Sequence, residues 1–154
     1  MEKVSIIVPV YNAAEYVGKC LESVALQDYK NIEIIVVEDG SDDESPDVCK
    51  EYARRYDNIK VYHDKCGTAG AARNYGMSKA AGDYVMFVDA DDYLTDNCVV
   101  SELIKKMEKV DIVVGNYQRL WKNRLLDASK NSGFAGLNIL HSPLSPTSAS
   151  LWLI

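Results

Sequence analysis

The sequence alternates between short apolar runs and longer amphipathic stretches, and this alternation restricts the fold more than any other feature. Runs suited to buried strands lie at residues 4–8, 32–37, 58–63, 83–88 and 111–117. Apolar residues at helical spacing fill the intervals, at residues 13–27, 45–57, 68–82 and 97–109. Strands that alternate with helices favour a mostly parallel sheet with helices on both faces. The sequence therefore predicts a three-layer α/β/α fold.

Two of the helical stretches carry recognisable start and stop signals. Pro46 falls in the first turn of the second stretch, where its missing N–H leaves no hydrogen bond unmade. Gly82 stands at the end of the third stretch, and glycine commonly terminates a helix. We therefore expect helices to begin near residue 45 and to end near residue 82.

Composition and charge exclude two broad classes of protein. No apolar run approaches the roughly 20 residues that a membrane-spanning helix needs. The formal net charge of −6 argues against a general nucleic-acid surface, because such surfaces depend on Lys and Arg. The start of the sequence lacks the apolar region of a signal peptide, and the four cysteines form no CxxC pair. We expect a cytoplasmic protein of one domain, either free or peripheral at the inner face of a membrane.

Three of the predicted strands end in polar loops. These loops read "PVYN" at residues 9–12, "EDGSDD" at 38–43 and "DADD" at 89–92. In open parallel sheets, ligands bind in the crevice outside the carboxyl ends of the strands. The three loops are therefore expected to face one binding crevice.

Four segments in this order resemble the family 2 glycosyltransferases, which use nucleotide-sugar donors and have the Rossmann-like GT-A fold. They are "VSIIVPVYN" with "CLESV" behind it, "IIVVEDGSDD", "GAARNYG" and "GDYVMFVDADD". The resemblance covers about residues 3–117. It implies a nucleotide-sugar-binding core over residues 1–117, followed by an atypical C-terminal segment of the same domain over residues 118–154.

The resemblance also implies a metal site at the end of the fourth strand. Asp89 to Asp91 would be the DxD element, in which Asp91 ligates Mn²⁺ or Mg²⁺ bridging the donor diphosphate and Asp89 lies near the ribose. Hard divalent cations prefer carboxylate and phosphate oxygens, and Mg²⁺ commonly takes only one or two protein carboxylates. A third ligand is not needed, so we expect Asp92 to cap the following turn or helix.

A base pocket is the third implication of the resemblance. Asp39 would accept a hydrogen bond from the base, usually uracil, while Pro9 and Tyr11 shape the pocket. Asp39 precedes a glycine, however, and is equally typical of a turn, and Tyr11 could be a rim residue. The family more often has Asp where this chain has Glu38, so the nucleotide preference stays open.

Arg73, in "GAARNYG", resembles the family's arginine near the nucleotide and its phosphates, although a surface helix arginine is an equal alternative. Gly67 and Gly70 do not fit the GxGxxG spacing of dinucleotide-binding folds, which argues against NAD. His63 and His141 have no partner at a spacing typical of a site, and we expect both to be structural.

No general base can be identified. In the resembled family a carboxylate well after the DxD deprotonates the acceptor hydroxyl, but the sequence has no Asp or Glu after Asp127. Two functions therefore stay open. One is inverting transfer from a UDP-sugar in cell-surface polysaccharide synthesis, and the other is a truncated, non-catalytic nucleotide-sugar-binding module. A sugar nucleotidyltransferase would need a basic, glycine-rich loop where "PVYNAAEY" stands.

The sequence closes with the apolar residues 151–154, "LWLI", after a stretch rich in Ser and Pro. An apolar tail in water lowers solubility, so this tail is expected to pack. We expect it either to cover the acceptor side of the crevice or to dock on a second subunit in a homodimer.

Overall fold

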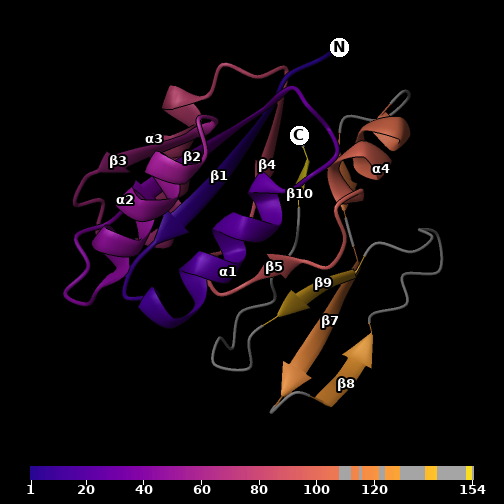
Figure 1. Ribbon diagram of the computed structural model, residues 1–154. Coiled ribbons are helices and arrows are strands. Elements are labelled where there is room, and N and C mark those ends of the chain that lie inside the picture. The colour runs from indigo at the N-terminus through magenta and orange to yellow at the C-terminus, as the bar shows by residue number, and fades with distance from the viewer. Residues whose placement is uncertain (108–111, 115, 122–123, 129–137, 142–151, 154) are drawn as a thin grey trace.

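The computed structural model describes residues 1–107, 112–114, 116–121, 124–128, 138–141 and 152–153, and these form a helix-flanked main sheet and a smaller second sheet (Figure 1). The strands of the main sheet are β1 (Val4–Val10), β2 (Ile32–Glu38), β3 (Ile59–His63), β4 (Tyr84–Phe87), β6 (Val113–Val114) and β10 (Trp152–Leu153). The helices are α1 (Ala14–Ala25), α2 (Ser45–Arg55), α3 (Ala69–Lys79) and α4 (Val99–Lys106). This order confirms the predicted α/β class.

The first four strands are parallel and lie in the order β3-β2-β1-β4. Ile6 at the centre of β1 is paired with Ile34 of β2 and Met86 of β4, and all three side chains are fully buried. Every residue of β2 is buried. Burial on both faces is typical of a central parallel strand covered by helices, so the predicted buried strands are confirmed for β1 and β2, whereas β3 exposes Lys60 and His63.

Helices cover both faces of this sheet. Val4, Ile6 and Val8 of β1 belong to one core cluster, to which α1, α2 and α4 contribute their buried residues. Ile7 points to the opposite face and packs there with Ala72 of α3. Helix α3 approaches so closely that a Cβ at Gly76 would lie 2.5 Å from Cγ2 of Ile7.

The order in which strands are added to the sheet reverses between β1 and β4, although the two strands are parallel. From β1 the chain moves outward to β2 and then to β3, whereas the next strand, β4, lies on the other side of β1. Such a reversal opens a crevice outside the carboxyl ends of the two adjacent strands, where open α/β sheets bind ligands. The loops after β1 and β4 are therefore placed at the same crevice.

Two predicted elements need correction. The strand predicted over residues 111–117 is divided, because β6 lies in the main sheet whereas β7 (Asn116–Trp121) lies in the second. The second sheet has the order β5-β9-β7-β8, with β5 (Tyr93–Leu94), β8 (Arg124–Ala128) and β9 (Asn138–His141). Helix α3 ends at Lys79 rather than at Gly82.

The C-terminal tail also differs from the prediction. Trp152 and Leu153 form β10, which runs antiparallel to both of its neighbours and pairs Leu153 with Met86 of β4 and Trp152 with Val114 of β6. Trp152 and Leu153 therefore lie within the main sheet, between β4 and β6, and do not line the crevice. The homodimer stays a prediction. The stretch rich in Ser and Pro before it lies outside the described residues.

Among the helices that the structure describes, none has the length and apolarity needed to cross a membrane.

Candidate functional site

A pocket of about 870 Å³ lies at the carboxyl ends of β1, β2 and β4 and beside the start of α3. This volume is within the range of roughly 300–1,000 Å³ that is typical of small-molecule sites. The pocket is lined by all six residues that the sequence singled out, Pro9, Tyr11, Asp39, Arg73, Asp89 and Asp91. The three polar loops therefore face one crevice, as predicted from strand order and loop composition.

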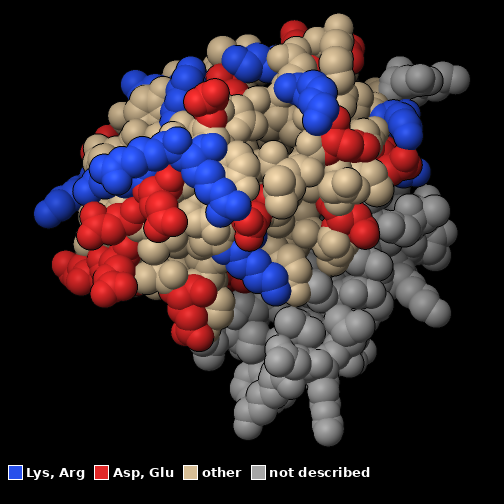
Figure 2. All heavy atoms as spheres, in the orientation of Figure 1, with Lys and Arg blue, Asp and Glu red and all other residues tan. Residues whose placement is uncertain are grey.

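The neighbourhood of the pocket is acidic. Figure 2 shows acidic side chains gathered at the lower left of the face that is drawn, where the loop after β2 and the start of α2 lie. This segment carries the exposed residues Asp42, Asp43, Glu44 and Asp47. An anionic ligand in the pocket must therefore be held by individual cations, because the surrounding field is unfavourable to it.

A tight turn after β4 presents two aspartates to the pocket. The backbone N–H of Asp92 donates to the carbonyl oxygen of Asp89 at 3.0 Å, which closes the turn. Asp89 and Asp91 line the pocket, whereas Asp92 is only 3% exposed and is not part of the lining. Asp92 does not cap the next helix, because α4 begins at Val99 and its N-cap position is Cys98.

A buried thiol, that of Cys20, lies next to this turn. The Cys20 Sγ donates to the carbonyl oxygen of Asp89 at 3.4 Å from inside the core. Burial raises the pKa of the Cys20 thiol well above its usual value, and the negative charges of Asp92, Asp89 and Asp91 raise it further. The carboxylates of the turn thus lie close enough to Cys20 to disfavour its thiolate.

The described residues do not form a complete metal cage. No group of three or more His, Cys, Asp or Glu side chains in this part of the chain is arranged to hold a metal ion. Asp91 and Asp89 nevertheless offer hard carboxylate oxygens at an acidic turn, which is the donor type that Mg²⁺ and Mn²⁺ prefer. A cation at this turn would need further ligands, such as phosphate oxygens, to complete its coordination.

Arg73 belongs to the pocket rather than to an outer helix surface. It lies in the second turn of α3, whose start is capped by Thr68, with the Thr68 hydroxyl accepting from the N–H of Ala71 at 3.1 Å. The Arg73 guanidinium pairs with Asp89 Oδ1 at 2.5 Å, and the side chain of Arg73 is 34% exposed. This ion pair connects α3 to the turn after β4, and Arg73 lines the pocket, whereas its contact with a nucleotide stays a prediction.

Asp39 follows β2 and is both a turn residue and a pocket residue. Its Oδ1 accepts a hydrogen bond from the N–H of Gly67 at 2.9 Å, which joins the loop after β2 to the loop after β3. Gly40 has φ of +72°, a backbone conformation that is strained for residues that carry a Cβ. The two descriptions of Asp39 are compatible, because the turn is what directs the carboxylate into the pocket.

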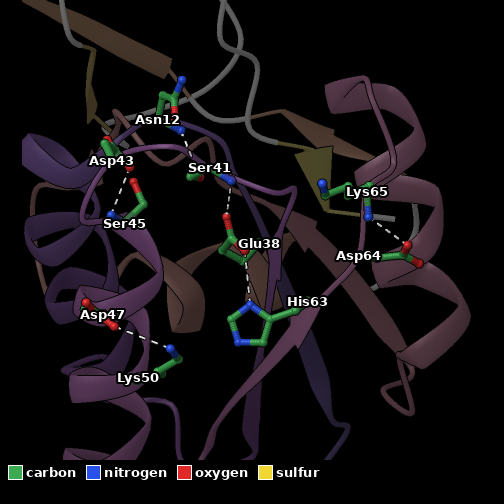
Figure 3. A network of polar contacts seen from close by, with 10 residues as sticks. All are labelled: Asn12, Glu38, Ser41, Asp43, Ser45, Asp47, Lys50, His63, Asp64 and Lys65. Atoms are coloured by element: carbon green, nitrogen blue, oxygen red, sulfur yellow. Dashed lines mark hydrogen bonds and ion pairs between the residues drawn. The ribbon is translucent and has the colours of Figure 1, made fainter.

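Glu38 is not part of the pocket lining, and Figure 3 shows its carboxylate between Ser41 and His63. Glu38 is 4% exposed, and its Oε1 accepts a hydrogen bond from the N–H of Ser41 at 2.6 Å. Its Oε2 makes a second hydrogen bond with His63 Nδ1 at 3.1 Å. Burial alone would raise the pKa of Glu38, but the hydrogen bonds from Ser41 and His63 outweigh burial and lower it. Glu38 and His63 are therefore structural, and the side chain of His141 lies outside the described residues.

Reciprocal hydrogen bonds hold the loops after β1 and β2 together (Figure 3). The N–H of Asn12, which has φ of +47°, donates to Ser41 Oγ at 3.0 Å, and Asn12 Oδ1 accepts from the N–H of Asp42 at 2.9 Å. Asp43 Oδ2 accepts from the N–H of Ala14 at 3.0 Å. This network fixes the wall of the pocket that carries Tyr11.

Sequence reasoning missed other side chains of the lining, including Asn12, Tyr16, Asp42, Lys65 and Thr68. Lys65 and Thr68 come from the loop after β3, "HDKCGT". The rule that ligands bind at the carboxyl ends of parallel strands applies to this strand too. That rule would have indicated Lys65 as a cation of the crevice.

Comparison with known proteins identifies the family. The model of the family described as "Glycosyl transferase family 2" matches residues 5–136. Glycosyltransferase GlyA of Streptococcus pneumoniae is 44% identical over 117 residues, which are 75% of this chain and 17% of that protein. The putative glycosyltransferase EpsH of Bacillus subtilis is 41% identical over 114 residues, 74% of this chain and 33% of that protein. The chain therefore spans a third or less of the length of these two relatives.

Solved structures agree with the sequence comparison. Residues 1–349 of S. aureus TarS in complex with UDP-GlcNAc match with a TM-score of 0.66 and 29% identity, over 81% of this chain and 37% of that one. The mannosyltransferase PcManGT from Pyrobaculum calidifontis, in complex with GDP-Man and Mn²⁺, matches with a TM-score of 0.66 and 25% identity, over 77% and 35% of the two chains. The chain belongs to glycosyl transferase family 2 and has the GT-A fold.

Proposed function

We propose that the pocket binds a UDP-sugar together with Mn²⁺ or Mg²⁺, as the donor site of an inverting glycosyltransferase. The observation that supports this most directly is the convergence of loops from β1, β2 and β4 and the start of α3 on one pocket. Each of these loops supplies a side chain suited to one part of a nucleoside diphosphate. The proposed donor therefore fits the order of the strands.

The base is assigned to the side of the pocket formed by β1 and β2. Asp39 accepts the imide N–H of uracil, and its orientation is fixed by the hydrogen bond from Gly67. Pro9 and Tyr11 border the same space, and Tyr11 is 58% exposed, so its ring is accessible for contact with a base. Cytosine offers no proton at the ring nitrogen that faces Asp39, and this favours UDP over CDP.

The phosphates and the ribose are assigned to the side formed by β4 and α3. In this arrangement Asp89 lies near the ribose and Asp91 holds the divalent cation. The cation, when bound, neutralises the charge that develops on the diphosphate leaving group. Arg73 supplies a second positive group, and its ion pair with Asp89 keeps the guanidinium directed toward the pocket.

Two structural relatives bind ligands of the proposed class. TarS is described in complex with UDP-GlcNAc, and PcManGT with GDP-Man and Mn²⁺. Both structures match three quarters or more of this chain. Our proposal of uracil depends on Asp39, whose carboxylate can accept the imide N–H that cytosine lacks.

We propose transfer to an acceptor hydroxyl in cell-surface polysaccharide synthesis, with residues 1–117 as the nucleotide-sugar-binding core. Residues 118–154 would be an atypical C-terminal segment of the same domain. The described cysteines are all free thiols, which supports a reducing cytoplasmic location, either free or at the inner face of a membrane. The alternative is a donor-binding module without turnover, since the chain spans only part of its relatives.

One experiment separates donor binding from turnover. Calorimetric titrations of UDP, GDP, CDP and TDP, with and without Mn²⁺, measure the donor site, and a screen for sugar transfer and donor hydrolysis then measures catalysis. We expect UDP to bind most tightly and only with Mn²⁺ present. Binding without turnover would favour the module, and the absence of any nucleotide binding would contradict both functions.

A further inference from the structure

Lys65 is a cation of the pocket to which the proposed function gives no role. It lies in the loop between β3 and α3 and lines the pocket. In the sheet order β3-β2-β1-β4, strand β3 is separated from β4 by two other strands. Lys65 therefore enters the pocket from the side opposite to Asp91 and close to Asp39.

The stem of Lys65 is seated on Gly40. A Cβ at Gly40 would lie 3.1 Å from Cγ and 3.3 Å from Cε of Lys65, so the missing side chain provides the surface on which the stem packs. Figure 3 shows the side chain of Lys65 directed toward the loop after β2. Because Gly40 follows Asp39 directly, this packing places the stem of Lys65 against the loop that carries Asp39.

The ammonium of Lys65 is available to a ligand. Lys65 and Arg73 are the cations of the pocket lining, and Arg73 is engaged with Asp89. Lys65 Nζ makes no ion pair with any residue that the structure describes, and the hydrogen bond of its backbone N–H goes to Asp64. A lysine ammonium carries three donors and no acceptor, so it selects an acceptor atom on its ligand.

One acceptor and one donor thus lie together at the base side of the pocket. Asp39 is an acceptor held by Gly67, and Lys65 is a donor held by Gly40. Uracil presents the complementary pair, an imide N–H beside the carbonyl oxygen at ring position 4. Cytosine has a bare ring nitrogen and an amino group at these positions, which would face a carboxylate and an ammonium respectively.

We propose that Lys65 donates to the carbonyl oxygen at position 4 of uracil and is a specificity-determining residue beside Asp39. This inference rests on the proposed function, because it requires a uridine nucleotide in the pocket. Lys65 then acts on the base and not on the phosphates. Its removal must change the discrimination between bases, whereas loss of a phosphate contact would weaken all nucleotides alike.

The test is the ratio of the UDP and CDP dissociation constants, measured by calorimetry with Mn²⁺. Lys65→Met should weaken UDP about tenfold and leave CDP within about twofold, so the preference for UDP falls about tenfold. Lys65→Gln should keep more of the UDP affinity and strengthen CDP, because an amide can donate to a carbonyl and accept from an amine. Lys60→Met, at an exposed position of β3 outside the pocket, is the matched control and should change neither constant.

The outcomes that would overturn this inference are distinct. Equal weakening of UDP and CDP in Lys65→Met would indicate a phosphate contact, and an unchanged ratio would indicate a solvated lysine. If Asp39→Ala removes the preference while Lys65→Met does not, the Lys65 inference fails and the proposed function stands. If the unmodified chain binds neither nucleotide, both fail. Thermal unfolding midpoints of the variants, expected to match the unmodified chain, show that the fold is retained.

Discussion

The two ends of the main sheet both carry charged side chains, but they use them in opposite ways. At the amino end, the Glu33 carboxylate accepts from Ser5 Oγ at 2.7 Å, Lys3 Nζ at 2.9 Å and the N–H of Ala81 at 2.7 Å. Glu33 is 6% exposed. At the carboxyl end, carboxylates from several loops surround a pocket of about 870 Å³ that is open to a ligand.

The difference lies in how the charges are satisfied. Burial alone would raise the pKa of Glu33, but the hydrogen bonds from Ser5, Lys3 and Ala81 outweigh it and lower the pKa. The amino-end carboxylate is thus satisfied by the protein itself. At the carboxyl end, Asp89 pairs with Arg73, and both Asp89 and Asp91 line the pocket, where a ligand can reach them. We therefore expect the amino end to contribute to stability and the carboxyl end to binding.

Close packing reinforces the amino end. A Cβ at Gly82 would lie 2.7 Å from the carbonyl oxygen of Lys3 and 2.8 Å from the backbone nitrogen of Ser5. The N–H of Gly82 also donates to Ser5 Oγ at 2.9 Å. Gly82 therefore lets the chain that enters β4 approach the start of β1, which is a packing role rather than the helix-ending role expected from the sequence.

The largest effect is expected from Glu33→Ala. Removing the carboxylate leaves the Ser5 hydroxyl, the Lys3 ammonium and the Ala81 N–H without their acceptor, and the free energy of unfolding should fall by about 3 kcal/mol. Chemical denaturation measures this change. Glu51→Ala, at an exposed position of α2, is the control and should change stability by less than about 0.5 kcal/mol. If the two substitutions lower the free energy of unfolding equally, the carboxylate at the amino end has no special role in stability.

Asp91→Asn should weaken ligand binding and leave stability nearly unchanged, the opposite of Glu33→Ala. It keeps the shape of the side chain but removes a charge, so the strengthening of UDP binding by Mn²⁺ should be lost, a change of about 2–3 kcal/mol, or about a hundredfold. The free energy of unfolding should change by less than about 1 kcal/mol. Calorimetry and denaturation measure the two quantities separately.

Asp92→Asn is the matched control for Asp91. Because Asp92 is 3% exposed and is not part of the pocket lining, its substitution should affect stability more than the Mn²⁺ effect. A larger loss of Mn²⁺-dependent binding in Asp92→Asn than in Asp91→Asn would refute the assignment of the metal ligand.

A smaller effect is expected from Asp39→Ala. Loss of the acceptor for the uracil imide should remove most of the preference for UDP over CDP, worth about 1–3 kcal/mol. The N–H of Gly67 also loses its partner, so a modest decrease in stability should accompany the loss. Paired titrations of UDP and CDP test this, and unchanged discrimination in the mutant would show that Asp39 does not contact the base.

The smallest expected effect concerns pH. Glu33 and Glu38 both have a pKa below the usual value of 4.5 in the folded chain. Their contribution to stability is complete above the pKa of the unfolded chain and is lost as pH falls through the lowered pKa. The free energy of unfolding should therefore decrease as the pH falls below about 4.5. Glu33→Gln should make this dependence shallower, and an unchanged slope would contradict the role of Glu33.

The sequence predicted the parallel core because its signals are local. Each of β1 to β4 is an apolar run, and the buried side chains of α1 recur at helical spacing, so the period of the pattern identifies the element. The six lining residues followed from the rule for strand ends together with the family resemblance. Their roles in binding stay predictions.

The elements that were missed depend on contacts between distant segments. Strand β10 has two residues and exists through its pairing with β4 and β6, which no local pattern encodes. Because the resembled family more often has Asp at position 38, Glu38 left the nucleotide preference open, yet its side chain is buried and does not line the pocket. Side chains alternate along a strand, so Glu38 shares the side of Val36, which faces α1 and α2. That alternation could have indicated the buried position of Glu38.

The central claim is that the carboxyl-end pocket binds UDP and a divalent cation as one unit. Calorimetric titration of UDP with and without Mn²⁺, and of Mn²⁺ with and without UDP, tests it directly. Because Asp91 and the diphosphate would share the cation, each ligand should tighten the other by the same factor, and neither should bind well alone. If the affinity for UDP is independent of Mn²⁺, the carboxylates of the turn after β4 do not form the metal site described above.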